Sequence, residues 1–259
     1  MYDELRAEHP RLLFEACVNG GHRVDFAALR RAHYVSMTDT FDPLANRRAF
    51  HDAVYALPPS MCECYVESHP GESLATFRFM LRSGMTGWCA PMLDTRQWSP
   101  GQRAAARRPF GIYKRVLRSL INAAKVYHVS ARPDGVHWDG IEHADAGRSG
   151  GVLSAFRGTT SGRHHAFVPR GLSPGARYAV ASEDGGAGAQ TATGHELMER
   201  GLDLRLDEPG SSDLVYFRRT SGGASTPRTS GGSGSPREGP RPASPPRCPS
   251  WGRPSRRRW

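Results

Sequence analysis

Between residues 11 and 125, short apolar runs alternate with longer amphipathic stretches. A short apolar run suits a buried strand, and apolar residues that recur every three to four positions suit one face of a helix. The repeated pattern therefore predicts four strand–helix units, a topology that builds a parallel sheet with helices outside it. The predicted strands are 12–17, 34–38, 61–66 and 85–92, and the predicted helices are 25–32, 45–57, 74–82 and about 100–124.

Local signals support two of these helix boundaries. Ser99 followed by Pro100 is a suitable N-cap and first helical residue, and Pro58 with Pro59 ends the second helix. Four strand–helix units are half of an eight-unit barrel, so the pattern leaves two arrangements open. The fold class is α/β, either a doubly wound sheet or half of a (β/α)8 TIM-type barrel.

After residue 126 the sequence changes to short β-type runs separated by Gly and Pro turns. This spacing is typical of an antiparallel β-sandwich. The predicted strands are 126–130, 151–156, 164–168, 178–181 and 213–217. We therefore expect a partial barrel over 1–125, a sandwich over 126–219 and a tail over 220–259.

The tail contains no Val, Ile, Leu, Met or Phe and holds eight of the 20 prolines, so it predicts disorder. Its eight arginines and single Glu238 carry +7 of the formal charge of +10, leaving +3 for residues 1–219. The charge of the folded part thus indicates no specific nucleic-acid partner. A genuine disordered extension and a frameshifted end of the coding sequence both fit this composition.

The five cysteines are odd in number and irregularly spaced, which suits neither a disulfide framework nor a zinc site. No apolar run approaches the roughly 20 residues of a membrane span, and the first residues lack the pattern of a signal peptide. We expect a protein of the reducing cytoplasm, without a cofactor, a metal or a membrane partner.

Polar residues concentrate directly after the first two predicted strands, where barrel enzymes place their active sites. On pattern alone, a Gly-Gly pair is also a plain tight turn, and Asp39 is also a helix cap or turn residue. Both interpretations stay open. The residues concerned are Glu15, Cys17, Asn19, Gly20, Gly21, His22, Arg23 and Asp25 after one strand, and Thr38, Asp39, Thr40 and Asp42 after the next.

Two of these segments resemble glycoside hydrolase family 36, the melibiase-type α-galactosidases. Residues 15–25, EACVNGGHRVD, resemble the segment E-N-C-x-S-G-G-x-R-x-D, and residues 38–43, TDTFDP, resemble S-D-x-T-D-P at the expected separation. Weaker similarity continues through 112–114, 127, 132–140, 193–198 and 211–215. The resemblance covers roughly residues 5–218.

The resemblance implies a retaining hydrolase of terminal α-galactosides, which uses two carboxyl groups about 5 Å apart. It places Asp39 at the acid/base position and Cys17, Gly20 and Gly21 at the sugar subsite. Further residues match positions that support the loops, namely Arg23, Asp25 and Asp42.

The family's nucleophile is the Asp of a K-x-D motif on the preceding strand, and this sequence contains no such motif. The N-terminal sandwich and the first four barrel strands of the family are also missing. Inside the motifs, Ala16, Asn19, Thr38 and Phe41 replace the usual Asn, Ser, Ser and Thr. We therefore expect a fragment with little activity alone.

Three other functions stay open. They are a transglycosylase of the same family, a non-catalytic carbohydrate-binding or assembly protein, and, weakest, a nucleic-acid binder that acts through the tail. The expected partners are an α-galactoside and either a second copy of the chain or a complementing N-terminal chain.

Overall fold

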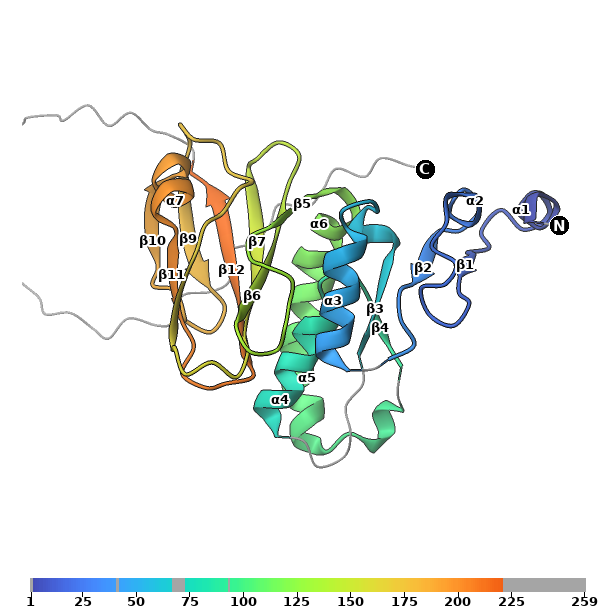
Figure 1. The fold of residues 1–259 in the computed structure, drawn as a ribbon, viewed down its shortest axis with the longest axis horizontal. Coiled ribbons are helices and arrows are strands. Elements are labelled where there is room, and N and C mark those ends of the chain that lie inside the picture. The colour runs from blue at the N-terminus through green and yellow to red at the C-terminus, as the bar shows by residue number, and fades with distance from the viewer. Residues whose placement is uncertain (1, 41, 67–72, 93, 221–259) are drawn as a thin grey trace, which may run out of the picture. The chain divides into compact units, whose positions relative to one another are not determined.

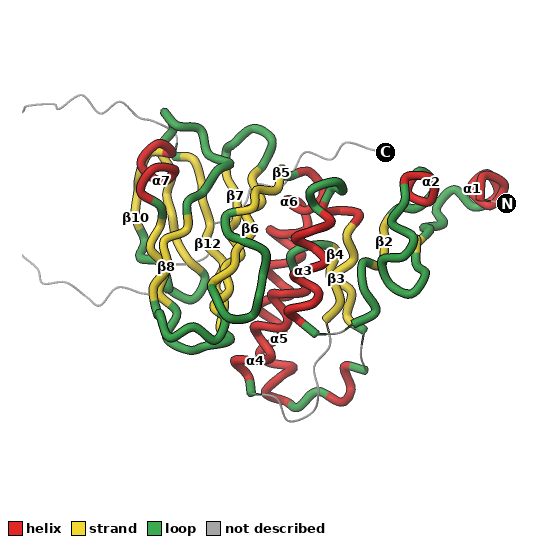
Figure 2. Tube along the Cα trace, viewed as in Figure 1, coloured by secondary structure: helices red, strands yellow, loops and turns green. Residues whose placement is uncertain are grey.

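The computed structural model describes residues 2–40, 42–66, 73–92 and 94–220. Phe41 and nearly all of the tail predicted to be disordered lie outside the described residues. Described residues up to Thr220 form one compact unit, in which two groups of strands are separated by a group of helices (Figure 1, Figure 2).

The first group is a four-stranded parallel sheet in the order β1-β2-β3-β4. This confirms the predicted alternation of strands and helices. Its strands are β1 (Glu15–Ala16), β2 (Tyr34–Ser36), β3 (Cys62–Val66) and β4 (Trp88–Pro91). They are shorter than predicted, most of all β1, because Leu12 and Leu13 are exposed and lie outside the ladder with β2.

Several helices, among them α3, α4 and α5, begin where a short polar side chain caps them. Ser99 and Gln102 form a reciprocal capping box with Pro100 in the first turn, which confirms the predicted start of the long helix. That helix is not one continuous α-helix to residue 124: a π-helical turn interrupts it. The helical segments are α1 (Tyr2–Glu8), α2 (Phe26–Leu29), α3 (Pro43–Ala53), η1 (Pro59–Met61), α4 (Leu74–Gly84), η2 (Thr95–Gln97), α5 (Pro100–Ile112), the π-turn η3 (Tyr113–Leu117) and α6 (Arg118–Ala123).

The second group of strands is antiparallel, as the sequence predicted. A six-stranded sheet has the order β10-β9-β12-β7-β6-β5, and a two-stranded sheet pairs β11 with β8. The elements are β5 (Lys125–His128), β6 (Trp138–Ala144), β7 (Gly150–Arg157), β8 (His164–Phe167), β9 (Arg177–Ser182), β10 (Gln190–Thr193), α7 (Gly194–Arg200), β11 (Leu202–Arg205) and β12 (Ser211–Arg219).

Strands β6, β10 and β11 and helices α1 and α7 were not predicted. Strand β6 was not predicted because its sequence, WDGIEHA, shows no alternation of apolar and polar residues. All seven of its residues are buried. Its two carboxyl groups have partners far along the chain: Asp139 pairs with Arg47, and Glu142 accepts the backbone N–H groups of Arg170 and Gly171. A local sequence pattern does not indicate such distant partners.

An apolar cluster joins the helices to the antiparallel sheet. It contains Phe77 and Leu81 of α4 and Leu117 of η3, together with Val152 of β7 and Leu214 of β12. Burial shared in this way couples the two groups of elements energetically. The division at residue 125 into separate domains stays a prediction.

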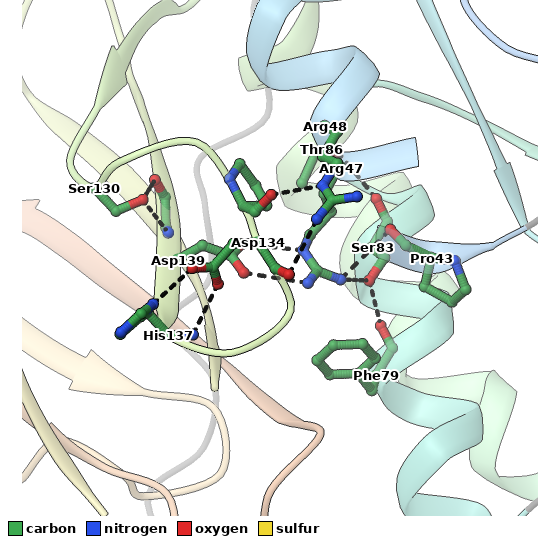
Figure 3. Close-up of polar contacts among 12 residues, drawn as sticks. Pro43, Arg47, Arg48, Phe79, Ser83, Thr86, Ser130, Asp134, His137 and Asp139 are labelled. Carbon is green, nitrogen blue, oxygen red and sulfur yellow. Dashed lines mark hydrogen bonds and ion pairs between the residues drawn. The ribbon is translucent and has the colours of Figure 1, made fainter. Parts of the chain in front are cut away.

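A buried ion pair adds a polar link between the same groups. The Arg47 guanidinium donates from Nε to Asp139 Oδ1 at 3.0 Å and from Nη2 to Oδ2 at 3.2 Å. Its third nitrogen, Nη1, donates to Ser83 Oγ at 2.8 Å. Figure 3 shows Arg47 of α3 between Ser83 of α4 and Asp139 of β6. The pair therefore fixes α3 and α4 to the antiparallel sheet.

His143 of β6 should make the fold sensitive to acid. Burial lowers its pKa to about 4, whereas a histidine in an unfolded chain titrates near pH 6.5. Between these values the unfolded state binds more protons than the folded state, so the free energy of unfolding falls as the pH drops through that window. We expect this residue alone to cost roughly 2 to 4 kcal/mol between pH 7 and pH 4.

Urea unfolding at pH 7, 6, 5 and 4 measures this dependence. The variant His143→Gln should flatten the slope relative to the unaltered chain, and His9→Gln, at an exposed histidine, should leave it unchanged. Equal slopes for all three proteins would show that His143 is not the acid-sensitive group.

Candidate active site

The loops that follow β1 and β2 touch each other at the carboxyl edge of the parallel sheet. The two strands are paired in parallel, with Glu15 opposite Tyr34. A Cβ atom added to Gly20 would lie 2.8 Å from Thr38 Cα and 2.9 Å from Asp39 N. One added to Gly21 would lie 2.8 Å from Met37 O. The two glycines therefore let the first loop reach the backbone that carries Asp39.

The turn itself requires unusual backbone angles. Asn19 has φ 47° and Gly20 has φ 65°, so both are left-handed. Glycine adopts this conformation without a steric cost, and asparagine tolerates it better than most residues. Asn19 therefore suits this position, at which the resembling family segment has Ser.

Replacing Gly20 with alanine should disturb this contact. The added methyl group would clash with the backbone of Thr38 and Asp39. In addition, the left-handed conformation costs about 1–2 kcal/mol for a residue with a Cβ. We expect Gly20→Ala to lower the free energy of unfolding by roughly 2–4 kcal/mol, measured by urea denaturation.

Gly210→Ala is the matched control, because Gly210 has φ 64° with no atom within 4 Å of its added Cβ. It reports the conformational cost alone, so the difference between the two variants reports the contact with the Asp39 backbone. Equal losses of unfolding free energy in the two variants would mean that the two loops are not in close contact.

The segment with Asp39 is held by a series of short side chains. Thr40 N donates to Thr38 Oγ1 and Asp42 N donates to Thr40 Oγ1, both at 3.2 Å. The Asp42 carboxylate caps α3 by accepting the Ala45 N–H at 2.7 Å. Asp39 itself is exposed. Its carboxyl group is thus presented to solvent on a loop with a defined course.

Asn46 anchors this loop from beneath, and the sequence analysis did not identify it. Its buried amide donates to Thr40 O at 2.9 Å and to Asp42 O at 3.1 Å, and its Oδ1 accepts the Tyr65 N–H at 3.1 Å. The residue ties the Asp39 loop to β3. In the sequence Asn46 is only a polar residue near the start of the predicted helix 45–57, which gives no sign of these contacts.

Cys17, Arg23 and Asp25 lie around a cavity of about 530 Å³ beside β1 and α2. The Asp25 carboxylate caps α2 by accepting the Ala28 N–H at 2.9 Å. Asp39 does not line this cavity. Among the predicted site residues, the structure therefore brings Gly20 against the backbone of Asp39, and groups Cys17 with Arg23 and Asp25 at the edge of the sheet. Gly21 lies against the backbone of Met37.

The two faces of the parallel sheet differ in character. Strand register places Val35, Cys62, Cys64 and Cys89 on the face toward the helices, where they are buried. The opposite face carries polar and aromatic side chains from all four strands, namely Glu15, Tyr34, Ser36, Glu63, Tyr65 and Trp88. We call this second face the polar sheet face.

Side chains on the polar sheet face interact closely. Ser36 Oγ and Tyr65 Oη are 2.7 Å apart, and the rings of Tyr34 and Trp88 meet edge to face with centroids 4.0 Å apart. Burial, followed by the charge of Glu15, raises the pKa of Glu63 to about 7. Such a shifted carboxyl group is typical of functional sites. The alternation of Glu63 and Tyr65 along β3 was the signal in the sequence.

Within the described parts of the chain, no three His, Cys, Asp or Glu side chains gather as a metal site would require. Nor does any helix there have the length and apolar character of a membrane span.

A family model and several known proteins match parts of this chain. The model of the family Melibiase matches residues 1–122. Probable α-galactosidase C of Aspergillus terreus is 27% identical over 228 residues, which are 85% of this chain and 29% of that protein. The chain thus spans less than a third of this relative.

Solved structures of the same kind share the fold. The galactosidase domain of the α-galactosidase-sucrose kinase AgaSK aligns with a TM-score of 0.74 and 20% identity, over 85% of this chain and 30% of that one. Two structures of the GH36 α-galactosidase AgaA of Geobacillus stearothermophilus, one with raffinose and one with stachyose, align with a TM-score of 0.72, 19% identity and the same coverages.

Proposed function

We propose, from the premise that this chain belongs through residues 1–122 to the melibiase family, that it forms part of a retaining glycoside hydrolase of terminal α-galactosides. The contact of Gly20 and Gly21 with the backbone at Met37, Thr38 and Asp39 carries this proposal. It brings both segments that resemble the family into one site.

The same premise gives the architecture a finer interpretation. We take β1 to β4 with their helices as the C-terminal half of a (β/α)8 barrel, and β5 to β12 as the sandwich that follows it. The parallel order β1-β2-β3-β4 supports this interpretation. So does the polar sheet face, since barrel strands direct alternate side chains to an interior.

Asp39 would act as the acid and then as the base. As a carboxylic acid it protonates the glycosidic oxygen of the leaving group, and as a carboxylate it then takes a proton from the water that releases the sugar. Its exposure leaves room for a leaving group and for water. The caps at Asp25 and Asp42 hold the two loops in place while these steps occur.

The sugar would bind over the turn at Gly20 and Gly21, with Cys17 beside it. Residues without a Cβ let backbone amides approach sugar hydroxyls closely. The bound raffinose and stachyose of the AgaA structures support an α-galactosyl group as the part recognised. The nucleophilic carboxylate would come from a segment outside this sequence, because the chain lacks the K-x-D motif.

A single-chain chimaera tests the function. In it, this chain replaces the aligned 30% of AgaA, and the product is assayed with aryl α- and β-galactosides. We expect hydrolysis of the α-anomer only, with α-galactose as the first product seen by proton NMR. A β-configured first product, or equal turnover of both substrates, would contradict the proposal.

We also propose that the protein works in a reducing compartment. Cys62, Cys64 and Cys89 are buried and free, and burial raises the pKa of all three thiols, that of Cys64 to about 12. Quantitative thiol labelling of protein taken from its native cells tests this, since free thiols should be found without added reductant.

A further inference from the structure

Tyr55, which follows the end of α3, carries an aromatic ring that is both exposed and fixed in orientation. The residue is 70% exposed. The His128 ring of β5 stacks on one face of the Tyr55 ring, with centroids 3.9 Å apart and planes 8° from parallel. The His51 ring of α3 stands across it at 76°, with centroids 5.7 Å apart. The other face of the Tyr55 ring is therefore a flat apolar surface open to solvent.

The residues beneath this ring belong to two elements that are held together. His128 Nε2 donates to the backbone carbonyl of His51 at 2.8 Å, and the two imidazole rings meet with centroids 4.4 Å apart. His51 itself is buried. Because a helix and a strand both support it, the Tyr55 ring needs little ordering when a ligand packs on it, which favours binding.

A polar pair lies beside the ring. Asp52 precedes Tyr55 by less than one helical turn, and its Oδ1 is 3.2 Å from His51 Nδ1. Arg132, in the loop after β5, places its Nε and its Nη2 each 2.8 Å from Asp52 Oδ2. The side chains of Asp52 and Arg132 are 48% and 55% exposed. They present a hydrogen-bond acceptor and a donor to solvent next to an aromatic face.

This combination matches the chemistry of a pyranose ring. The C–H groups on one face of a sugar can pack on an aromatic ring, while its hydroxyl groups donate to a carboxylate and accept from a guanidinium. In galactose the axial hydroxyl at carbon 4 points to one face, which leaves the C–H groups at carbons 3, 4 and 5 together on the other. A cation is the poorer ligand for the Tyr55 ring, because the charge of Asp52 is already paired with Arg132.

The Tyr55 ring lies away from the candidate active site. Strands β2 and β3 are parallel, and α3 connects the carboxyl end of β2 to the amino end of β3. The last residues of α3 are therefore at the opposite end of the sheet from the Asp39 loop, which precedes the first turn of the same helix.

We propose that Tyr55, Asp52 and Arg132 form a second carbohydrate site, which binds a galactosyl unit of an oligosaccharide outside the candidate active site. This inference rests on the proposed function, since that function makes galactosides the sugars that the protein meets. Such a site would hold a branched or extended substrate to the protein without taking part in bond cleavage.

Saturation-transfer NMR of the full chain with stachyose tests the site. We expect the strongest transfer to the protons at carbons 3, 4 and 5 of the terminal galactosyl unit. Tyr55→Ala should raise the dissociation constant by roughly threefold to tenfold, and Tyr55→Phe, which keeps the ring, should leave it unchanged. Phe26→Ala is the matched control, because Phe26 is 77% exposed and no hydrogen bond or ion pair joins its neighbour Asp25 to Arg132.

No transfer from the protein to stachyose, or the same dissociation constant for Tyr55→Ala and the unaltered chain, would overturn the proposal. An equal loss with Phe26→Ala would do so as well, and circular dichroism of each variant distinguishes a lost contact from a lost fold. In the single-chain chimaera, Tyr55→Ala should keep kcat/KM for an aryl α-galactoside, and a loss there would show that the two sites are not separate. If stachyose binds through Tyr55 but the chimaera does not hydrolyse, only the proposed function fails.

Discussion

Asp39→Asn is expected to lower kcat/KM for an aryl α-galactoside by about 10²- to 10⁴-fold in the single-chain chimaera, the usual worth of a general acid–base. The amide keeps the size of the side chain but neither gives a proton to the leaving oxygen nor takes one from water. The loss should be smaller for a dinitrophenyl leaving group, which departs without protonation. The chain by itself should show no measurable hydrolysis, because the retaining route needs a second carboxyl group as nucleophile.

Asp207→Asn, at an exposed aspartate of the antiparallel part, is the control and should keep full activity. The dependence of kcat/KM on pH distinguishes an acid/base role of Asp39 from a structural one. Only the loss of an acid/base group removes the limb of the pH profile that reports the titration of that group. If the isolated chain hydrolysed the substrate and Asp39→Asn abolished that activity, the nucleophile would lie within this sequence. Unchanged turnover of the chimaera variant would remove Asp39 from the reaction.

Arg47→Met should destabilise the fold by about 3–5 kcal/mol, the range for breaking one side of a buried ion pair. The side chains of Arg47 and Asp139 are 4% and 5% exposed, so the substitution leaves a buried carboxylate without its cation. The guanidinium also lies 4.7 Å from the Phe79 ring centroid and 4.4 Å from that of Phe156. Urea unfolding measures the loss.

Arg96→Met is the comparison, because Arg96 is 89% exposed and pairs with Asp94. Exposed pairs contribute about 0–1 kcal/mol. The double variant Arg47→Met with Asp139→Leu should recover much of the lost stability, since it removes the orphaned charge. If Arg47→Met cost no more than Arg96→Met, the ion pair would not link the helices to the antiparallel sheet.

Local chemistry was enough to predict most elements of the parallel sheet. A run such as 61–66 is short and mostly apolar. The Ser99-Pro100 start of α5 depends only on a hydroxyl and a ring within one turn of the helix. The placement of Asp39 just after β2 also followed from the chain, since a loop after a strand must lie at the carboxyl end of that strand. For such features the interacting atoms are a few residues apart.

Long-range contacts decided the remainder. Strand β6 places Asp139 and Glu142 in the interior, where a local pattern predicts exposed side chains. Arg47 compensates the burial of Asp139, and the amides of residues 170 and 171 compensate that of Glu142. Asn46 became recognisable as an anchor of the Asp39 loop only when β3 was seen beside it. The polar sheet face required the register of four strands.

The sequence by itself determined the four strand–helix units of the parallel sheet, the capped start of α5 and the two loops that carry the candidate site. Those features depend on interactions across a few residues, which periodicity and side-chain chemistry express directly. Only the tertiary structure decided which buried charges are paired, that Gly20 contacts the Asp39 backbone, and that Glu15, Glu63 and Tyr65 share one face of the parallel sheet. Each of these depends on atoms brought together from distant parts of the chain, and their energies follow from burial and distance, which a linear sequence does not contain.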